Sequence, residues 1–290
     1  MLKVAISVLV LFMSSVLIAD EHDYSFIEVD GNNLAYLCKG TGNLTVLMMA
    51  GMGLDAHASF KNTFHNAEPD NYRLCFYERA GTGKSAYKEP KVRKIIELVE
   101  EMEQFTLKVG MDELVLVPHS FGGFVARAFT NRNPNKVKGI VFVDAAHESW
   151  YADMKSSMSA NAWKTMELIM DWERNQHSFE DFAEASSHSD LYSIRADMPV
   201  IVMSRGIPHV SIRQTKMSYQ DVDVYTNSWN RSQQQLKKIS NDVQPVTMHY
   251  ASHLFDETDP WIVIDNIDKM VLKVTTKLNN QIRPTDKTSH

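Results

Sequence analysis

Short runs of apolar and β-branched residues recur along the chain, and polar or turn-forming residues separate them. The clearest runs are Leu44–Met49, Arg73–Tyr77, Glu113–Val117, Gly139–Val143, Val200–Met203 and Val246–Tyr250. Runs of this kind are typical of parallel strands buried on both faces. From Val92 to Val109 apolar residues recur at helical spacing among Lys and Glu, and further helical patterns follow Gly122 and Pro260. Strands that alternate with helices predict an α/β protein with a mostly parallel sheet flanked by helices.

The strand pattern disappears between residues 147 and 197, where Met, Trp, Glu and Ser predominate. The large apolar residues of this segment are Trp150, Met154, Met158, Trp163, Met166, Met170 and Trp172. They indicate the buried faces of two or three helices. We interpret residues 147–197 as a helical cap inserted after the sixth strand, with an apolar underside that lines a substrate pocket. The core is then expected in two parts, 20–146 and 198–277, followed by a polar tail, 278–290.

The first 19 residues differ from the rest of the chain. Met1–Lys3 carries a positive charge, Val4–Ile18 is apolar apart from three serines, and Ala19 precedes a polar stretch. This order is typical of a secretory signal peptide, and the apolar part is shorter than the ~20 residues that a spanning helix needs. We expect cleavage after Ala19 and export to the periplasm or the medium. No later segment approaches transmembrane length.

The chain has two cysteines, Cys38 and Cys75, and both lie within strand-like runs. An exported protein is able to keep a disulfide, so the two residues are candidates for a bridge. Two buried thiols that pack as small apolar side chains fit the sequence equally well. The sequence therefore leaves the pairing open.

The composition narrows the classes of partner. With 290 residues, of which 44% are hydrophobic, the chain is long enough to bury a large core. It has 30 Lys and Arg against 36 Asp and Glu, and both signs are scattered along the sequence. Because the basic residues do not form a stripe, nucleic-acid binding is not expected. None of the 11 histidines stands at a spacing typical of metal ligands, so no metal or other cofactor is expected.

One short segment carries the clearest chemical signal. The run Glu113–Val117 leads into Pro118, His119, Ser120, Phe121 and two glycines, and a helical pattern follows. A strand, a sharp turn with a serine, and then a helix form the context of a nucleophile elbow. The turn requires small residues around the serine. Gly122 meets this requirement, whereas Pro118 stands where the pattern has glycine.

Together with three other segments, this elbow resembles the α/β-hydrolase superfamily, in particular its capped serine esterase and lipase-like branch. The segments are Ala50–Gly53, with Ala in place of the family's His, Glu78–Ser85, with Glu in place of the family's Asp, and Ala251–Asp256 around a late histidine. The resemblance covers most of the chain after the leader. It implies the fold already expected from the strand and helix patterns, and it places the four segments around one site.

A serine hydroxyl is a poor nucleophile until a histidine accepts its proton during attack. For Ser120 the candidate base is His253, which follows the last predicted strand. His119 is adjacent to Ser120 but is expected to point away from it. The resemblance implies that the backbone N–H groups of Met52 and Phe121 form the oxyanion hole.

The third member of such a triad is a carboxylate that orients the histidine. Its usual place is the loop after the strand Val200–Met203, but residues 204–209 contain no acid. Asp144, at the end of the preceding strand, occupies the alternative position that some family members use. We therefore predict Asp144, with Asp221 or Asp223 as the alternatives.

These residues predict a serine hydrolase that cleaves a small or medium carboxylic ester with an apolar portion. The expected partner is a small molecule, and the oligomeric state is not readable from the sequence. The elbow serine disfavours superfamily members that need a carboxylate nucleophile. Peptidase, lactonase or C–C hydrolase activity stays open, and so does a non-catalytic binding protein on the same scaffold.

Overall fold

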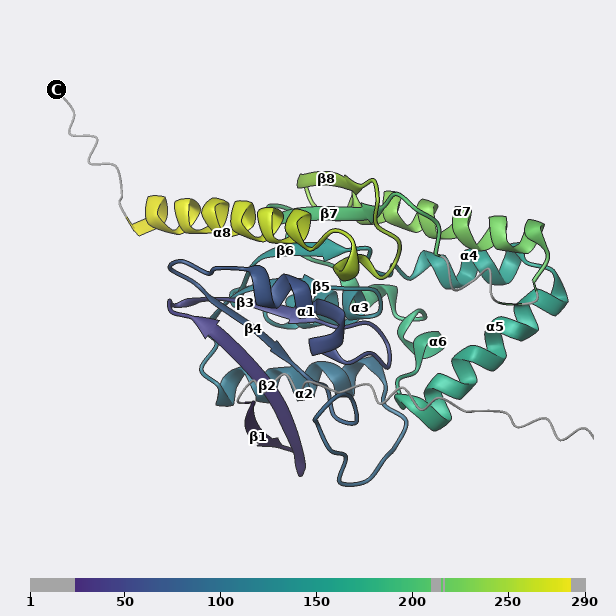
Figure 1. Ribbon diagram of the computed structural model, residues 1–290, viewed down its shortest axis with the longest axis horizontal. Coiled ribbons are helices and arrows are strands. Elements are labelled where there is room, and N and C mark those ends of the chain that lie inside the picture. Colours follow the sequence, from purple (N-terminus) through teal and green to yellow (C-terminus); the bar gives the residue numbers. More distant parts are fainter. Residues whose placement is uncertain (1–23, 210–214, 216, 283–290) are drawn as a thin grey trace, which may run out of the picture.

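The computed structural model describes residues 24–209, 215 and 217–282, and within these ranges eight strands form one sheet (Figure 1). The strands are β1 Ser25–Val29, β2 Asn32–Gly40, β3 Leu44–Met49, β4 Arg73–Tyr77, β5 Glu113–Pro118, β6 Val137–Val143, β7 Pro199–Arg205 and β8 Asp242–Met248. Their order across the sheet is β1-β2-β4-β3-β5-β6-β7-β8. Strand β2 pairs antiparallel with β1 and β4, and the remaining neighbours pair in parallel. The predicted mostly parallel sheet is confirmed.

Helices cover both faces of this sheet. The helices of the core are α1 Ala56–Asn66, α2 Ile95–Lys108, α3 Gly122–Arg132, α7 Tyr219–Leu236 and α8 Pro260–Ile282. Helices α1 and α8 pack on one face, and α2, α3 and α7 pack on the other (Figure 1). Alternate residues of the central strands serve the two cores. In β5, Leu114 and Leu116 belong to the α2 and α3 side, whereas Val115 and Val117 face α1 and α8.

The predicted helical insertion follows β6. It contains α4 Ser149–Ser157, α5 Ala160–Trp172, a π-helical turn Glu173–His177, the short helix α6 Phe182–Ala185 and a 3₁₀ turn Ser189–Tyr192. Figure 1 shows α4, α5 and α6 together at one end of the sheet. The buried Trp150, Met154 and Met166 belong to the same apolar core as α2, α3 and α7. The insertion, called the cap below, is therefore packed onto the core.

Three elements begin or end three or more residues away from the positions expected from the sequence. Strand β8 covers Asp242–Met248 rather than Val246–Tyr250, because it is an edge strand that tolerates polar residues and a proline. Helix α2 begins at Ile95, since the backbone of Arg93 is bonded to the cap segment around Glu180. Helix α8 continues to Ile282, beyond the expected start of the tail at residue 278.

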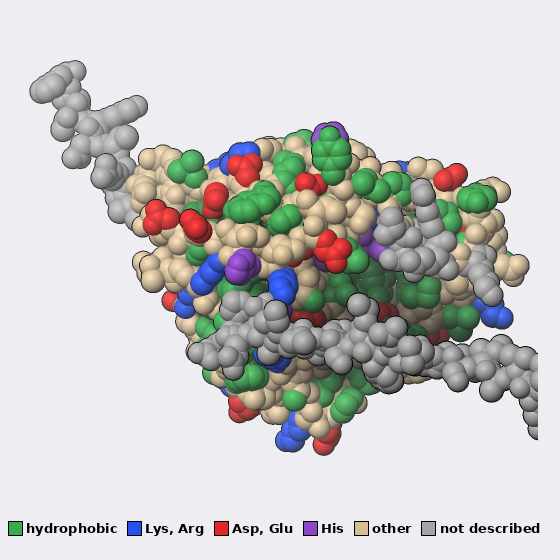
Figure 2. Space-filling view, viewed as in Figure 1, with side chains coloured by type: hydrophobic (Ala, Val, Ile, Leu, Met, Phe, Trp, Pro, Cys, Tyr) green, Lys and Arg blue, Asp and Glu red, His purple; other side chains and the backbone are tan. Residues whose placement is uncertain are grey.

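The ends of the chain are not part of this description. The predicted signal peptide, residues 1–19, lies outside the described residues, and so do residues 283–290 of the predicted tail. Within the described ranges, no helix has the length and apolar character needed to cross a bilayer. Acidic and basic side chains are interspersed on the face drawn in Figure 2.

The structure joins Cys38 and Cys75 in a disulfide. The two residues lie directly opposite each other in the antiparallel pair β2 and β4, so the bridge links neighbouring strands. It closes a loop of 37 residues in sequence. The sequence left this pairing open because spacing alone does not show which strands are neighbours.

Removal of this bridge is expected to lower the stability of the fold. A loop of this length predicts a loss of about 2–4 kcal/mol in the free energy of unfolding, because the unfolded chain has more conformational entropy without the bridge. Urea unfolding of the Cys38→Ala/Cys75→Ala double variant measures the loss. Thiol titration of the denatured, unreduced wild-type protein is the control, because two titratable thiols would contradict the bridge.

Candidate active site

The turn between β5 and α3 places Ser120 in a left-handed conformation, with φ of 50°. This conformation is uncommon for a residue with a side chain and turns the chain sharply from strand to helix. A Cβ at Gly122 would lie 2.8 Å from the carbonyl oxygens of Met49 and Ala50, so only glycine fits there. Pro118 is accommodated as the last residue of β5, in register with Met49. The sharp turn therefore forms despite the proline.

His253 lies in the loop between β8 and α8, and its ring joins the other two predicted residues. Its Nε2 is 2.9 Å from Ser120 Oγ, and its Nδ1 is 2.6 Å from Asp144 Oδ2. His119 points away from Ser120 and contacts the His253 carbonyl oxygen through Nε2 at 2.8 Å. Burial, reinforced by the neighbouring His253, lowers the pKa of His119 to about 3. A neutral His119 thus donates one hydrogen bond that holds the loop of His253.

Asp144 follows β6 and is fully buried. Its Oδ1 accepts hydrogen bonds from Trp229 Nε1 at 2.9 Å and from the backbone N–H of Arg205 at 3.3 Å. Its Oδ2 accepts from Arg205 Nη1 at 3.0 Å and contacts His253. Burial alone would raise the pKa of this carboxyl, but the Arg205 guanidinium and the hydrogen bonds hold it well below its usual range. The carboxylate is therefore ionised and fixed beside the imidazole.

The two alternative acids lie elsewhere. Asp221 is at the start of α7, where it accepts hydrogen bonds from Ser218 and Ser159. Asp223 is exposed on the same helix. Of the three acids considered from the sequence, Asp144 is the one that contacts His253.

Sequence reasoning did not assign Arg205, the last residue of β7. Its side chain is only 2% exposed and lies against the ring of Trp229, 4.9 Å from the ring centroid. Its Nη1 is also 3.4 Å from His253 Nδ1. One indirect signal was present: residues 204–209, where the acid is usually found, contain the basic residue Arg205 and no acid. In the structure, Arg205 forms an ion pair with Asp144, which follows the neighbouring strand β6.

Arg205→Met is expected to lower the free energy of unfolding by about 3 kcal/mol at neutral pH, because it leaves one partner of a buried ion pair. The pKa of Asp144 should then rise. A carboxyl with a depressed pKa stabilises the fold above its unfolded pKa and loses this effect as the pH falls through its folded pKa. The variant should therefore lose stability at a higher pH than the wild type on acidification. Melting temperature measured against pH tests this, and identical acid profiles would contradict it.

The two residues whose backbone amides are predicted for the oxyanion hole lie close to Ser120. Phe121 follows Ser120 and caps α3, and Met52 lies in the loop after β3. This loop comes close to the serine, because a Cβ at Gly51 would lie 3.1 Å from Ser120 Cβ. Gly53 has φ of 62° and no room for a side chain beneath Glu173 of the cap. Residues 50–53, the oxyanion loop below, are thus held between the elbow and the cap.

A cavity of about 340 Å³ opens beside Ser120. It is lined by Met52, Leu54, Ser120, Trp150, Met166, Ile169, Met170, Phe182, His209, Tyr225, Trp229, His253 and Leu254. Most of these side chains are apolar or aromatic, and many come from the cap. Figure 2 shows hydrophobic side chains in a recess on the side of the molecule toward the cap, which lies at the right in this view. The cavity therefore offers an apolar environment next to the serine.

His209 was not assigned from the sequence. Its ring stacks on that of His253, with centroids 4.7 Å apart, and it lines the cavity. Burial, reinforced by the charges of His253 and Arg205, lowers the pKa of His209 to about 3. His209 is therefore a neutral part of the cavity wall.

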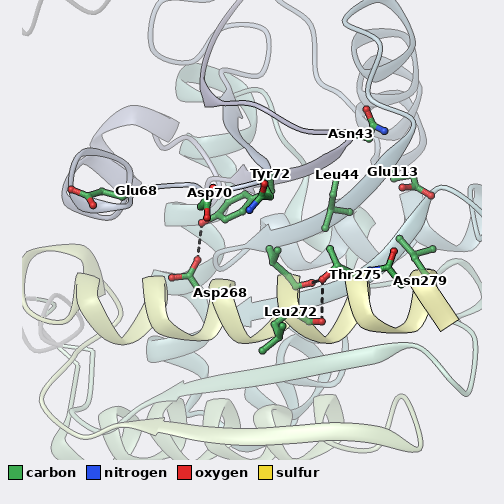
Figure 3. A pocket seen from close by; sticks show the side chains of 13 residues that line it. Asn43, Leu44, Glu68, Asp70, Tyr72, Glu113, Asp268, Leu272, Thr275 and Asn279 are labelled. Carbon is green, nitrogen blue, oxygen red and sulfur yellow. Dashed lines mark hydrogen bonds between the residues drawn. The ribbon is translucent and has the colours of Figure 1, made fainter.

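A second hollow of about 670 Å³ lies along α8 (Figure 3). It borders Leu44 and Glu113, the first residues of β3 and β5, and Tyr72 donates a hydrogen bond to Asp268 there. Ser120 and Asp144 follow the carboxyl ends of their strands. The second hollow is therefore at the opposite end of the sheet and is not the candidate site.

Residues 45–271 match the model of the alpha/beta hydrolase fold family. The chain belongs to the α/β-hydrolase fold family. An esterase from Thermogutta terrifontis shares the fold, with a TM-score of 0.60 and 19% identity over 87% of this chain and 99% of that one. A putative lipase from Acinetobacter baumannii aligns with a TM-score of 0.62 and 15% identity, covering 88% of this chain and 92% of that one.

The curated relatives match a shorter part of this α/β-hydrolase. The uncharacterized protein YbdG of Bacillus subtilis is 27% identical over 133 residues, which is 45% of this chain and 40% of that protein. The chain thus covers less than half of the length of this relative. Membership of the family rests on the match over residues 45–271.

Proposed function

We propose that this α/β-hydrolase is a serine hydrolase that cleaves carboxylic esters through an acyl-enzyme. The observation that carries the proposal is the continuous set of contacts from Ser120 Oγ through His253 to Asp144, at the wall of an apolar cavity. A serine next to a base that is itself oriented by a buried carboxylate is the arrangement that activates a hydroxyl. The esterase and lipase among the solved neighbours support the same class.

In the proposed reaction, Ser120 Oγ attacks the ester carbonyl while His253 Nε2 accepts its proton. Asp144 keeps the proton on His253 Nδ1 and stabilises the imidazolium that forms. The N–H groups of Met52 and Phe121 donate to the oxygen on which negative charge develops. His253 then protonates the departing alcohol, and a water activated by the same histidine releases the acid and restores Ser120.

The cavity suggests the substrate class. Its volume of about 340 Å³ is at the lower end of small-molecule sites, and its lining is dominated by Met and aromatic side chains. Each methylene that enters contributes ~0.8 kcal/mol, or about fourfold in affinity for the transition state. The proposed substrate is an ester with a neutral acyl group of short to medium length.

A series of p-nitrophenyl esters tests this proposal. We expect kcat/KM to rise from acetate through butyrate to hexanoate, then to level or fall for palmitate once the cavity is full. A monosuccinate ester is the matched control, because its charged acyl group must lose water without finding a partner. Equal rates across the series, or faster cleavage of the monosuccinate, would contradict the substrate class.

The same series contains the test against other chemistry. Anilides and lactones of the preferred acyl group measure peptidase and lactonase activity. We expect the ester to be cleaved fastest. Binding of these compounds without turnover would favour a non-catalytic binding protein.

We further propose that the protein is exported. The leader-like sequence of residues 1–19 and the Cys38–Cys75 bridge support this, because disulfides persist in oxidising compartments. Fractionation of cells that express the full chain should recover the protein outside the cytoplasm with the leader removed. Recovery of a full-length cytoplasmic protein would contradict export.

A further inference from the structure

Four buried charged side chains lie between the core and the cap. They are Arg79, Arg93, Glu101 and Glu180, and each is at most 6% exposed. Arg79 pairs with Glu180 at 2.5 Å, and Arg93 pairs with Glu101 at 2.9 Å and with Glu180 at 3.5 Å. Buried ion pairs are weak contributors to stability because both charges must leave water. Their presence here calls for another role, and the contacts of Arg79 and Glu180 with the oxyanion loop indicate one.

Arg79 is bonded to the loop that contains Met52. Its Nη1 donates to the carbonyl oxygen of Ala50 at 2.9 Å, and its Nη2 donates to that of Gly51 at 2.6 Å. The Gly51 carbonyl and the Met52 N–H belong to the same planar trans peptide and point in opposite directions. A donor that fixes the carbonyl on one side therefore fixes the direction of the N–H on the other.

Arg79 also lies beside the second proposed donor. Its guanidinium carbon is 6.0 Å from the ring centroid of Phe121. The contact is with the side chain of the residue whose backbone N–H is the other proposed member of the oxyanion hole. Arg79 thus contacts the chain next to both proposed donors and is not among the residues that line the cavity.

Glu180 reaches this network from the cap. Its Oε1 accepts from Arg79 Nε at 2.5 Å, and its Oε2 accepts from Arg79 Nη2 at 3.1 Å. The same Oε2 accepts from the backbone N–H of Gly53 at 3.1 Å. Glu180 is fully buried, so the two-point contact with the guanidinium is shielded from water. One carboxylate of the cap therefore holds Arg79 and the far end of the oxyanion loop together.

We propose that Arg79 and Glu180 are positioning residues that set the direction of the Met52 N–H in the oxyanion hole, and that the cap controls the hole through Glu180. This inference rests on the proposed serine-hydrolase function. Glu180 belongs to the cap, so a site with a displaced cap would keep Ser120, His253 and Asp144 but lose the fixed Met52 peptide. The cap then contributes to catalysis as well as to the cavity wall.

The kinetic consequence follows from where the Met52 amide acts. Its proposed partner is the oxygen that becomes charged in the transition state, and the ground-state ester gains little from it. A misdirected N–H should therefore lower kcat and leave KM nearly unchanged. Loss of one oxyanion donor typically costs ~100-fold or more, and a donor that is displaced but retained should cost about 10- to 100-fold.

Glu180→Gln is the sharpest test, because it keeps the shape but has one acceptor oxygen in place of two. Its NH2 group must then face either Arg79 Nε or the donors Arg79 Nη2 and Gly53 N–H. Glu101→Gln is the matched control, because it also removes one negative charge from the four buried charged side chains. Glu101 contacts Arg93 and the Ala80 N–H rather than the oxyanion loop. Both variants should melt at lower temperature. Only Glu180→Gln should lose about 10- to 100-fold in kcat with KM within about twofold of wild type. Equal losses in both variants, or no loss in a folded Glu180→Gln, would overturn the proposal.

A transition-state analogue separates positioning from general damage. An alkyl trifluoromethyl ketone forms a tetrahedral oxyanion on an active serine, whereas the free carboxylic acid product occupies only the cavity. Glu180→Gln should weaken the ketone by about the same factor as kcat and leave product inhibition unchanged. Parallel weakening of both ligands would show a structural effect and overturn the proposal.

Two further measurements test the proposal if Glu180→Gln does not fold. Arg79→Lys keeps the charge beside Glu180 but cannot donate to Ala50, Gly51 and Glu180 together, so it should show the same loss of kcat. In the wild-type protein, the Gly53 amide should exchange with solvent as slowly as amides of the central strands. Rapid exchange at Gly53 would overturn the proposal without any variant. A wild type that neither hydrolyses esters nor binds the ketone would instead count against the proposed function.

Discussion

Ser120→Ala should lower kcat for the preferred ester by about 10⁶-fold, because the reaction then has no nucleophile while the cavity stays intact. The folded state should be almost unaffected. Alanine lacks only the hydroxyl that contacts His253, and its backbone adopts the left-handed φ of residue 120 at a cost similar to that of serine. Steady-state hydrolysis and a thermal melt of the same preparation give both results.

The control for this variant is a serine of the cap. Ser156 is exposed, and its hydroxyl donates to the backbone oxygen of Asp153 within α4. Ser156→Ala should keep wild-type kcat and KM. Activity of Ser120→Ala within about tenfold of wild type would place the nucleophile elsewhere, since a removed serine nucleophile costs far more than that.

Asp144→Asn should lower kcat by about 10⁴-fold, because an amide cannot keep the proton on His253 Nδ1 or stabilise the imidazolium. It should also lower the free energy of unfolding by about 3 kcal/mol, since Arg205 is left as a buried charge without its partner. The loss of rate is therefore larger than any fraction unfolded explains. Single-turnover measurements at a temperature well below the melting transition separate the two effects.

Asp221→Asn is the matched control for this prediction. It changes a carboxylate that accepts from Ser218, the N-cap residue of α7, and from Ser159, neither of which belongs to the contacts of His253. Its melting temperature should fall slightly while kcat is retained. A large loss of kcat in Asp221→Asn together with near-normal turnover in Asp144→Asn would exchange their roles.

The parts of the site that follow from local sequence are those whose geometry is local. Ser120 was predictable because the strand, the tight turn and the helix are consecutive and because Gly122 leaves the space that the turn needs. His253 was predictable from its position after the last strand. Asp144 required a further step, the absence of an acid after β7, and its contact with His253 joins residues 109 positions apart.

The parts that the sequence did not reveal depend on contacts between distant segments. Arg205 and Asp144 are 61 positions apart, and Arg79 and Glu180 are 101 positions apart. A buried ion pair has no local pattern, since each member resembles an ordinary charged residue until its burial is known. The Cys38–Cys75 bridge depends in the same way on the register between β2 and β4. The two ion pairs also support residues found from the sequence, because Arg205 contacts Asp144 and Arg79 contacts Ala50 and Gly51.

The most direct test of the central claim is covalent labelling of the purified protein with a fluorophosphonate, read by intact mass and peptide mapping. The reagent needs an activated serine and no knowledge of the natural substrate. The contacts of Ser120 with His253 and of His253 with Asp144 predict one adduct, mapped to Ser120 and absent from Ser120→Ala. A folded wild-type protein that carries no adduct, or an adduct on another serine, would contradict the assignment of Ser120 as the nucleophile.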